Sequence, residues 1–226
     1  MSWRERGLYL GMTWWRLLLY FLAVFLTTAA LTAAGVWNPD SLRMQVFTGP
    51  ADLRGTSEYS PVELLQLGIL MVSGLLMAGL ARDHRGFRPL AIAIGGMAFV
   101  MLVRELDYFF DRYLVDNLWQ AVTAIAGAAL VAYLYRHRRR FGLNLARVWP
   151  SPALTLLFAG FGILVPFSLL VGHEPLWQSV LGDDYQRIIK LAVEEFIELS
   201  GYFLWMIGSV EIVYEIRHLD ARRQPS

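Results

Sequence analysis

The chain contains no cysteine among its 226 residues, and this absence removes several kinds of chemistry. Without thiols there can be no disulfide, no thiolate metal site and no cysteine nucleophile. The common catalytic motifs are missing too: there is no Gly-x-Ser-x-Gly elbow, no phosphate loop with its lysine and no Gly-x-Gly-x-x-Gly fingerprint. Any chemistry must therefore come from carboxylates, histidines, hydroxyls or cations.

Long polar segments are also lacking. The gaps between hydrophobic tracts reach at most roughly 25 residues, which is too short for a separate soluble domain. Hydrophobic residues make up 56% of the chain and the mean hydropathy is +0.44, which is too apolar for a soluble domain of this length. We therefore expect one membrane domain over residues 1–226, with the lipid bilayer as its main surroundings.

Six apolar tracts are long enough to cross a bilayer as helices. Ser60-Pro61 suits the cap and first turn of the second helix, and Ser151-Pro152 suits those of the fifth. Pro166 predicts a kink within the fifth helix because proline lacks the backbone N–H. The expected ranges are 12–36, 62–81, 89–111, 118–135, 152–171 and 185–216.

The net charge of +1 hides a strong asymmetry along the chain. Lysine and arginine gather at the N-terminus, at the turn 82–88, in the loop expected at 136–147 and in the tail, whereas most acidic residues lie on the other side. The positive-inside rule then predicts an all-α polytopic integral membrane bundle of about six transmembrane helices, N-in/C-in, in a bacterial inner membrane. Because membrane orientation explains the basic clusters, nucleic acid is not an expected partner.

Ionisable groups inside membrane segments are costly, by about 2.5 to 3.5 kcal/mol each on insertion scales, so each needs a partner or a function. Three of the expected helices carry such groups, all toward the outer face. On the last helix, Glu195, Glu198 and Tyr202 are spaced so that they share one face. The candidate metal or proton site consists of Glu63, Glu105, Glu195 and Glu198, supported by Gln66, Arg104, Asp107, Asp111, Lys190, Glu194, Tyr202 and His173.

Two interpretations of this carboxylate cluster stay open. In the first it is a structural set of salt bridges, with Lys190 paired to Glu194 and Arg104 paired to Glu198 or Glu195. In the second, some negative charge is left uncompensated because the acids outnumber the nearby bases, so the cluster binds a proton or a cation.

The residue types restrict which metal such a site could bind. It is rich in carboxylates, and three of the four histidines fall on the inner side, leaving only His173 outside. Mg, Ca or Mn would therefore suit it better than Zn. For such a site we expect Glu63, Glu105 and Glu198 to approach one another within about 3 to 6 Å.

Three functions are compatible with these features, and the sequence leaves open whether the chain is an enzyme. The first is a membrane protein whose outward-facing carboxylate cluster binds a proton or a hard divalent cation, in transport or sensing. The second is an outer-leaflet enzyme that uses a metal or a carboxylate on a lipid or lipid-linked substrate. The third is an assembly subunit that meets a membrane partner or a second copy of itself.

Near the inner end, Glu211 and Glu215 are expected to pair with Arg217 or with arginines of 136–147.

Overall fold

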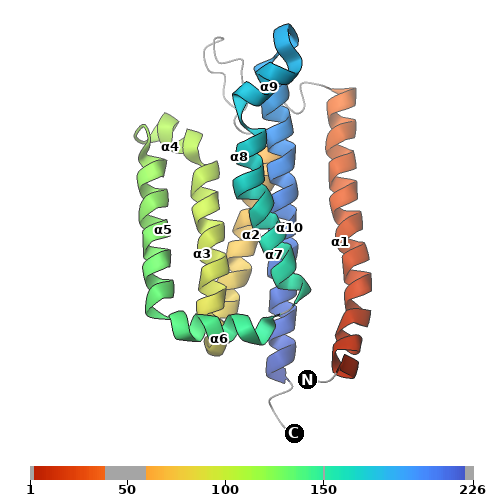
Figure 1. The fold of residues 1–226 in the computed structure, drawn as a ribbon, viewed down its shortest axis with the longest axis vertical. Helices are drawn as coiled ribbons and strands as arrows, with labels where there is room; N and C mark the ends of the chain where they lie inside the picture. Colours follow the sequence, from red (N-terminus) through yellow and green to blue (C-terminus); the bar gives the residue numbers. More distant parts are fainter. Residues whose placement is uncertain (1–2, 39–59, 150, 222–226) are drawn as a thin grey trace.

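The computed structural model describes residues 3–38, 60–149 and 151–221, and all regular structure in these ranges is helical (Figure 1). The polar connection expected between the first two helices falls largely on residues 39–59, outside the described ranges. Six segments in the described ranges are long and apolar enough to cross a membrane, the same number as the expected helices. They contain α1 (Trp3–Trp37), α2 (Pro61–Asp83), α3 (Arg88–Glu105), α5 (Leu118–Arg136), α7 (Pro152–Gly162) and α10 (Arg187–Ala221).

The core forms around α10, which packs against α7 and α2, while α2 packs against α3 and α3 against α5 (Figure 1). Two thirds of the α10 span are buried, whereas no residue in the most apolar stretch of α1 or of α5 is buried. The large side chains at the centre include Tyr202 and Trp205 of α10 and Met77 of α2. Helices α1 and α5 therefore form the periphery of the bundle.

Glycines allow α7 and α10 to approach closely. A Cβ atom added to Gly160 of α7 would lie 2.9 Å from the carbonyl oxygen of Gly201 of α10. One added to Gly208 of α10 would lie 2.7 Å from Cγ of Leu157. Small residues at helix crossings let backbones come together, and van der Waals packing then holds the helices.

The expected caps and the expected irregularity in the fifth span are both present. Ser60 Oγ accepts a hydrogen bond from the backbone N–H of Glu63 at 3.2 Å. Ser151 Oγ accepts one from Leu154 at 3.3 Å. Around Pro166, α7 passes through a π-helical turn, η3 (Ile163–Phe167), into α8 (Ser168–Val171). The wider turn accommodates the missing proline donor without ending the span.

Helix α1 begins at Trp3 instead of residue 12, and α10 ends at Ala221 instead of residue 216. Two further expected segments differ in their course. The helix expected at 89–111 ends at Glu105, and α4 (Asp107–Tyr113) follows after Leu106, whose backbone interrupts the helix (φ −97°, ψ 13°). The change of direction lets Glu105 point into the bundle while Asp107 and Asp111 are exposed. A continuous apolar pattern could not indicate where this change occurs.

The second difference is that 138–148, expected within a loop, forms helix α6 (Arg138–Val148). This helix lies across the ends of the spans and joins α5 to α7 (Figure 1). Phe141, Leu145 and Val148 recur at helical spacing and turn toward the core. The arginines among these residues give the segment the composition of a charged loop, although its apolar residues recur at helical spacing. The connection between α2 and α3 contains the short turn η2 (Arg85–Phe87), and the connection between α8 and α10 contains α9 (Glu174–Leu181) and the short turn η4 (Gly182–Asp184).

Candidate functional site: a carboxylate cluster at one end of the bundle

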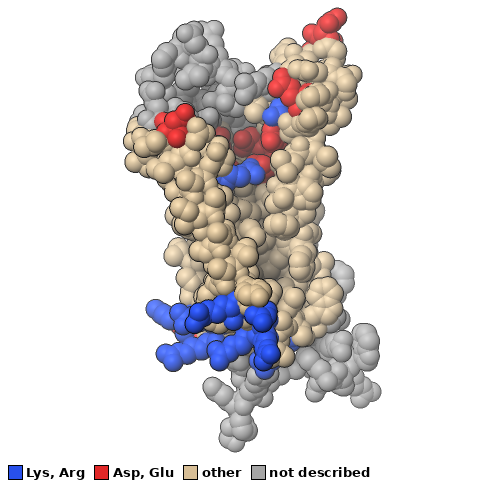
Figure 2. All heavy atoms as spheres, turned by 60° about the vertical axis from the view of Figure 1, so that its left-hand side comes forward, with Lys and Arg blue, Asp and Glu red and all other residues tan. Residues whose placement is uncertain are grey.

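Charged side chains separate to the two ends of the bundle. Figure 2 shows a band of lysine and arginine side chains at one end and acidic side chains around a hollow near the other. The basic end carries α6 and η2, and the acidic end carries α4, α9 and the beginning of α10. The candidate residues on α2, α3 and α10 all belong to the acidic end.

Arg104 occupies the centre of the cluster. Its Nη2 atom lies 2.6 Å from Oε1 of Glu198 and 3.1 Å from Oε1 of Glu105. The side chain of Glu198 is only 6% exposed, whereas that of Arg104 is 43% exposed. One guanidinium group therefore joins two carboxylates, one from the neighbouring residue on α3 and one from α10.

Two hydroxyl groups donate hydrogen bonds to these carboxylates. Ser168 Oγ donates to Oε1 of Glu198 at 2.6 Å. Tyr202 Oη donates to Oε1 of Glu105 at 2.6 Å. Glu105 and Glu198 therefore each accept a hydrogen bond from a hydroxyl group and contact the guanidinium group of Arg104. This part of the cluster matches the structural interpretation given above.

Glu195 differs from Glu105 and Glu198 because its described contact is with a neutral group. Gln66 Nε2 donates to Oε2 of Glu195 at 3.2 Å and to its backbone carbonyl at 3.1 Å. The charges of Glu63, Glu105 and Glu198 all act on Glu195. Gln66 is fully buried, and its Oε1 atom has no hydrogen-bond partner among the described residues. At this point of the cluster, Glu195 therefore lies near other carboxylates, and the buried Oε1 atom of Gln66 has no donor among the described residues.

The other supporting residues lie apart from this centre. Lys190 forms the expected pair with Glu194, with 3.0 Å between Nζ and Oε2. Asp111 is exposed, and its Oδ1 accepts a hydrogen bond from the backbone N–H of Asn117 at 2.7 Å. Asp107 is exposed on α4, and His173 is exposed at the start of α9.

The described residues do not provide the ligand set of a site for a hard divalent metal ion. Among the described residues, no three histidine, aspartate or glutamate side chains are arranged to hold a metal ion. Glu105 and Glu198 do meet, but both contact the guanidinium group of Arg104. The arginine occupies the position that a cation would need between the two carboxylates.

Ser168 is the residue of this cluster that sequence reasoning missed. It is 3% exposed and lies two residues after Pro166, at the start of α8. A polar residue in an apolar tract just beyond a proline was the available signal. Its connection to Glu198, thirty residues later, depends on how α8 packs against α10.

A second charged group lies nearer the basic end. Arg16 Nε of α1 is 2.9 Å from Oε1 of Glu211, and Tyr20 Oη donates to the same oxygen at 2.8 Å. The Arg16 guanidinium also lies 5.0 Å from the ring centroid of Tyr214. The expectation that Glu211 pairs with Arg217 or with the arginines of 136–147 is wrong, because its face of α10 is directed toward α1. These contacts fasten α1 to the bundle.

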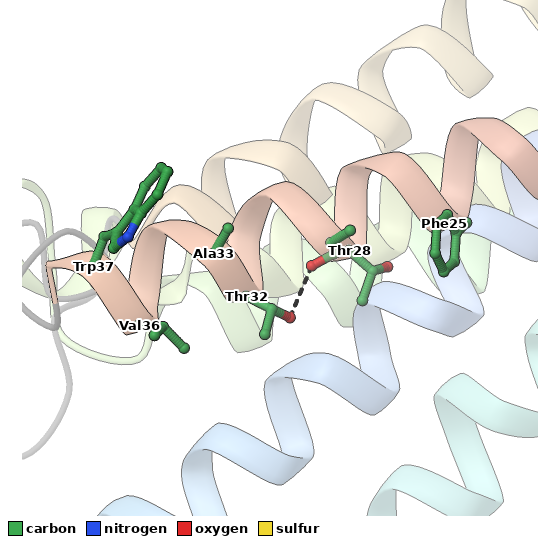
Figure 3. A pocket seen from close by; sticks show the side chains of 7 residues that line it. Phe25, Thr28, Thr32, Ala33, Val36 and Trp37 are labelled. Atoms are coloured by element: carbon green, nitrogen blue, oxygen red, sulfur yellow. Dashed lines mark hydrogen bonds between the residues drawn. The ribbon is translucent and has the colours of Figure 1, made fainter.

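A cavity of about 500 Å³ lies along α1. Figure 3 shows Phe25, Thr28, Thr32 and Trp37 on its wall. The hydroxyl group of Thr32 donates to the carbonyl of Thr28 at 2.9 Å, and that of Thr28 donates to Val24 at 2.9 Å. Since both hydroxyls are already used within the helix, this surface presents apolar groups, as a lipid-facing surface would.

Together the fold and the site define a helical chain with six potential membrane spans and a polar cluster at one end. In comparisons with known proteins, no family model, curated protein or solved structure matches the chain. The functional argument therefore depends on the geometry alone.

Proposed function

We propose that the chain is a multi-pass membrane protein that binds a proton at Glu195 from the outer side, as a step in transport or sensing. The observation that carries the proposal is the surroundings of Glu195. Its described partner is the neutral amide of Gln66, and the charges of three other carboxylates act on it. A charged carboxylate in such surroundings is unfavourable, and taking up a proton relieves the repulsion.

The distribution of charge supports the proposed orientation. The arginines of η2 and α6 belong to the basic end, which the positive-inside rule assigns to the cytoplasm. Both termini are then cytoplasmic and the acidic cluster opens outward, consistent with a bacterial inner membrane. Acidic side chains lie around a hollow at this end in Figure 2, and the side chain of Arg104 at the centre of the cluster is exposed.

The geometry favours a proton over a divalent cation. A hard divalent ion takes six or more oxygen ligands and usually needs several carboxylates around one point. Here Arg104 already neutralises much of the charge of Glu105 and Glu198. Glu195 has the neutral Gln66 as its described partner, and a single proton is enough to neutralise its carboxylate.

Infrared difference spectroscopy of the full chain in nanodiscs tests the proposal directly. A protonated carboxyl group gives a carbonyl band that a carboxylate lacks. We expect a band that disappears as the pH is raised between about 5 and 9, the range open to buried carboxyl groups. It should be lost in Glu195→Gln and retained in the matched control Glu194→Gln, since Glu194 is paired with Lys190.

A second readout of the same variants is thermal stability as a function of pH. A proton bound preferentially by the folded protein stabilises it at low pH, and the contribution is lost as the pH rises through the value at which the proton is released. Glu195→Gln should retain its stability across this range, whereas Glu194→Gln should follow the unmodified chain.

Three outcomes contradict the proposal. A carbonyl band that survives in Glu195→Gln assigns the proton to another residue, and the lack of any such band shows that the cluster stays ionised. A melting temperature that rises with the concentration of Mg or Ca indicates a metal site instead, because a ligand that binds only the folded state stabilises it by mass action.

A further inference from the structure

Helix α6 combines a buried face with a strongly basic exposed surface. Val148 and Asn144 are almost fully buried, at 1% and 2% exposure. Asn144 Nδ2 donates to the backbone carbonyl of Gly86 at 2.8 Å and thereby attaches α6 to η2. The helix is therefore held at a fixed position across the basic end of the bundle (Figure 1).

Exposed arginines surround this attachment. None of them forms an ion pair with an acidic residue in the part of the chain that the structure describes. Asp83, the acidic residue at the end of α2, is paired with Arg82 at 3.1 Å. We call this set the basic patch; it consists of Arg85, Arg88, Arg136, Arg138, Arg139, Arg140 and Arg147.

Apolar side chains stand among the arginines of the basic patch. Leu143 is 59% exposed, and Arg139, Arg140 and Arg147 lie one helical turn to either side of it. Trp149 follows the end of α6 and is 61% exposed. An exposed leucine and indole between arginines are typical of a helix at the boundary between lipid headgroups and acyl chains.

We propose that the basic patch on α6 and η2 is a binding site for anionic phospholipid headgroups. Arginine presents a planar set of donors that matches phosphate oxygens, and this set has no competing carboxylate here. Leu143 and Trp149 would contact the acyl region of the same lipid while the guanidinium groups hold its phosphate. The patch does more than orient the chain: it selects lipids by charge.

Lipid titration of the purified full chain tests this inference. Phosphatidylglycerol or phosphatidylcholine is added to the protein in detergent, and bound lipid is counted by native mass spectrometry. We expect preferential binding of phosphatidylglycerol. Arg140→Gln with Arg147→Gln should weaken that binding on the order of 25-fold, because each basic side chain near an anionic headgroup accounts for about a fivefold change.

The matched control is Arg82→Gln with Arg217→Gln, which removes the same charge from exposed positions at the same end but outside the patch. This control should bind phosphatidylglycerol nearly as well as the unmodified chain. Arg140→Lys with Arg147→Lys keeps the charge but not the planar donors, so it should bind phosphatidylglycerol more tightly than the glutamine variant and less tightly than the unmodified chain. This result separates a loss of charge from a folding defect.

Several results would overturn the inference. If the two lipids bind equally, or if the patch variant and its control lose phosphatidylglycerol binding to the same extent, the basic patch serves only to orient the chain in the membrane. Displacement of the lipid by millimolar inorganic phosphate would show that the site recognises free phosphate rather than a membrane headgroup.

Discussion

At the scale of single residues, the acidic cluster depends on one hydroxyl group that sequence inspection did not find. Ser168 donates to the buried carboxylate of Glu198, which also contacts Arg104. The spacing of Glu195, Glu198 and Tyr202 correctly indicated which face of α10 turns inward. It could not indicate that Tyr202 bonds Glu105 or that Gln66 bonds Glu195, because these contacts join helices whose relative rotation is set by packing.

Replacing Ser168 with alanine should destabilise the protein by about 1 to 3 kcal/mol, because Glu198 loses a donor while it stays buried. Ser200→Ala is the matched control. Ser200 is exposed on α10 and donates only to the carbonyl of Phe196 in its own helix, so its loss should change stability by less than about 0.5 kcal/mol. Thermal unfolding followed by the fluorescence of the eight tryptophans measures both. Equal effects of the two substitutions would show that the Ser168 contact contributes nothing specific.

At the scale of secondary-structure elements, the apolar tracts predicted the spans well because the length of an apolar run is a local property. The ranges expected at 62–81 and 118–135 agree with α2 and α5 within two residues at either end. The break at Leu106 and the helix α6 were not predicted. Both depend on nonlocal contacts, Glu105 with Tyr202 and Asn144 with Gly86.

The contact between α7 and α10 gives a test at this scale. In Gly160→Ala the new methyl group would lie 2.9 Å from the Gly201 carbonyl oxygen and 3.0 Å from the Trp205 nitrogen. Because these are backbone atoms, the helices must separate, and we expect a loss of about 1 to 3 kcal/mol in stability. Gly162→Ala, two residues later in the same helix, has nothing within 4 Å. It should be neutral or stabilising by up to about 1 kcal/mol. If thermal unfolding shows no difference between the two, the close crossing of α7 and α10 is wrong.

At the scale of the whole molecule, the orientation can be tested by labelling, since the chain has no native cysteine. Cysteines introduced at Ser179 and Ala146 would be exposed, at the acidic end and on α6 respectively. Asn144 is unsuitable because it is buried. An impermeant thiol reagent added to intact cells should modify the cysteine at Ser179 but not the one at Ala146. Modification of Ala146→Cys from outside would reverse the proposed topology.

The attachment of α1 has a consequence for how the chain is made. Arg16 and Tyr20 belong to the first span, and their partner Glu211 belongs to the last, 191 residues beyond Tyr20. During synthesis the first helix is therefore made long before its carboxylate partner exists. In the proposed orientation Arg16 can remain near the cytoplasmic headgroups until then, because long basic side chains reach the interface from the ends of spans. Helix α1 can form these contacts only after α10 has been made, so the formation of α10 is the step that closes the bundle.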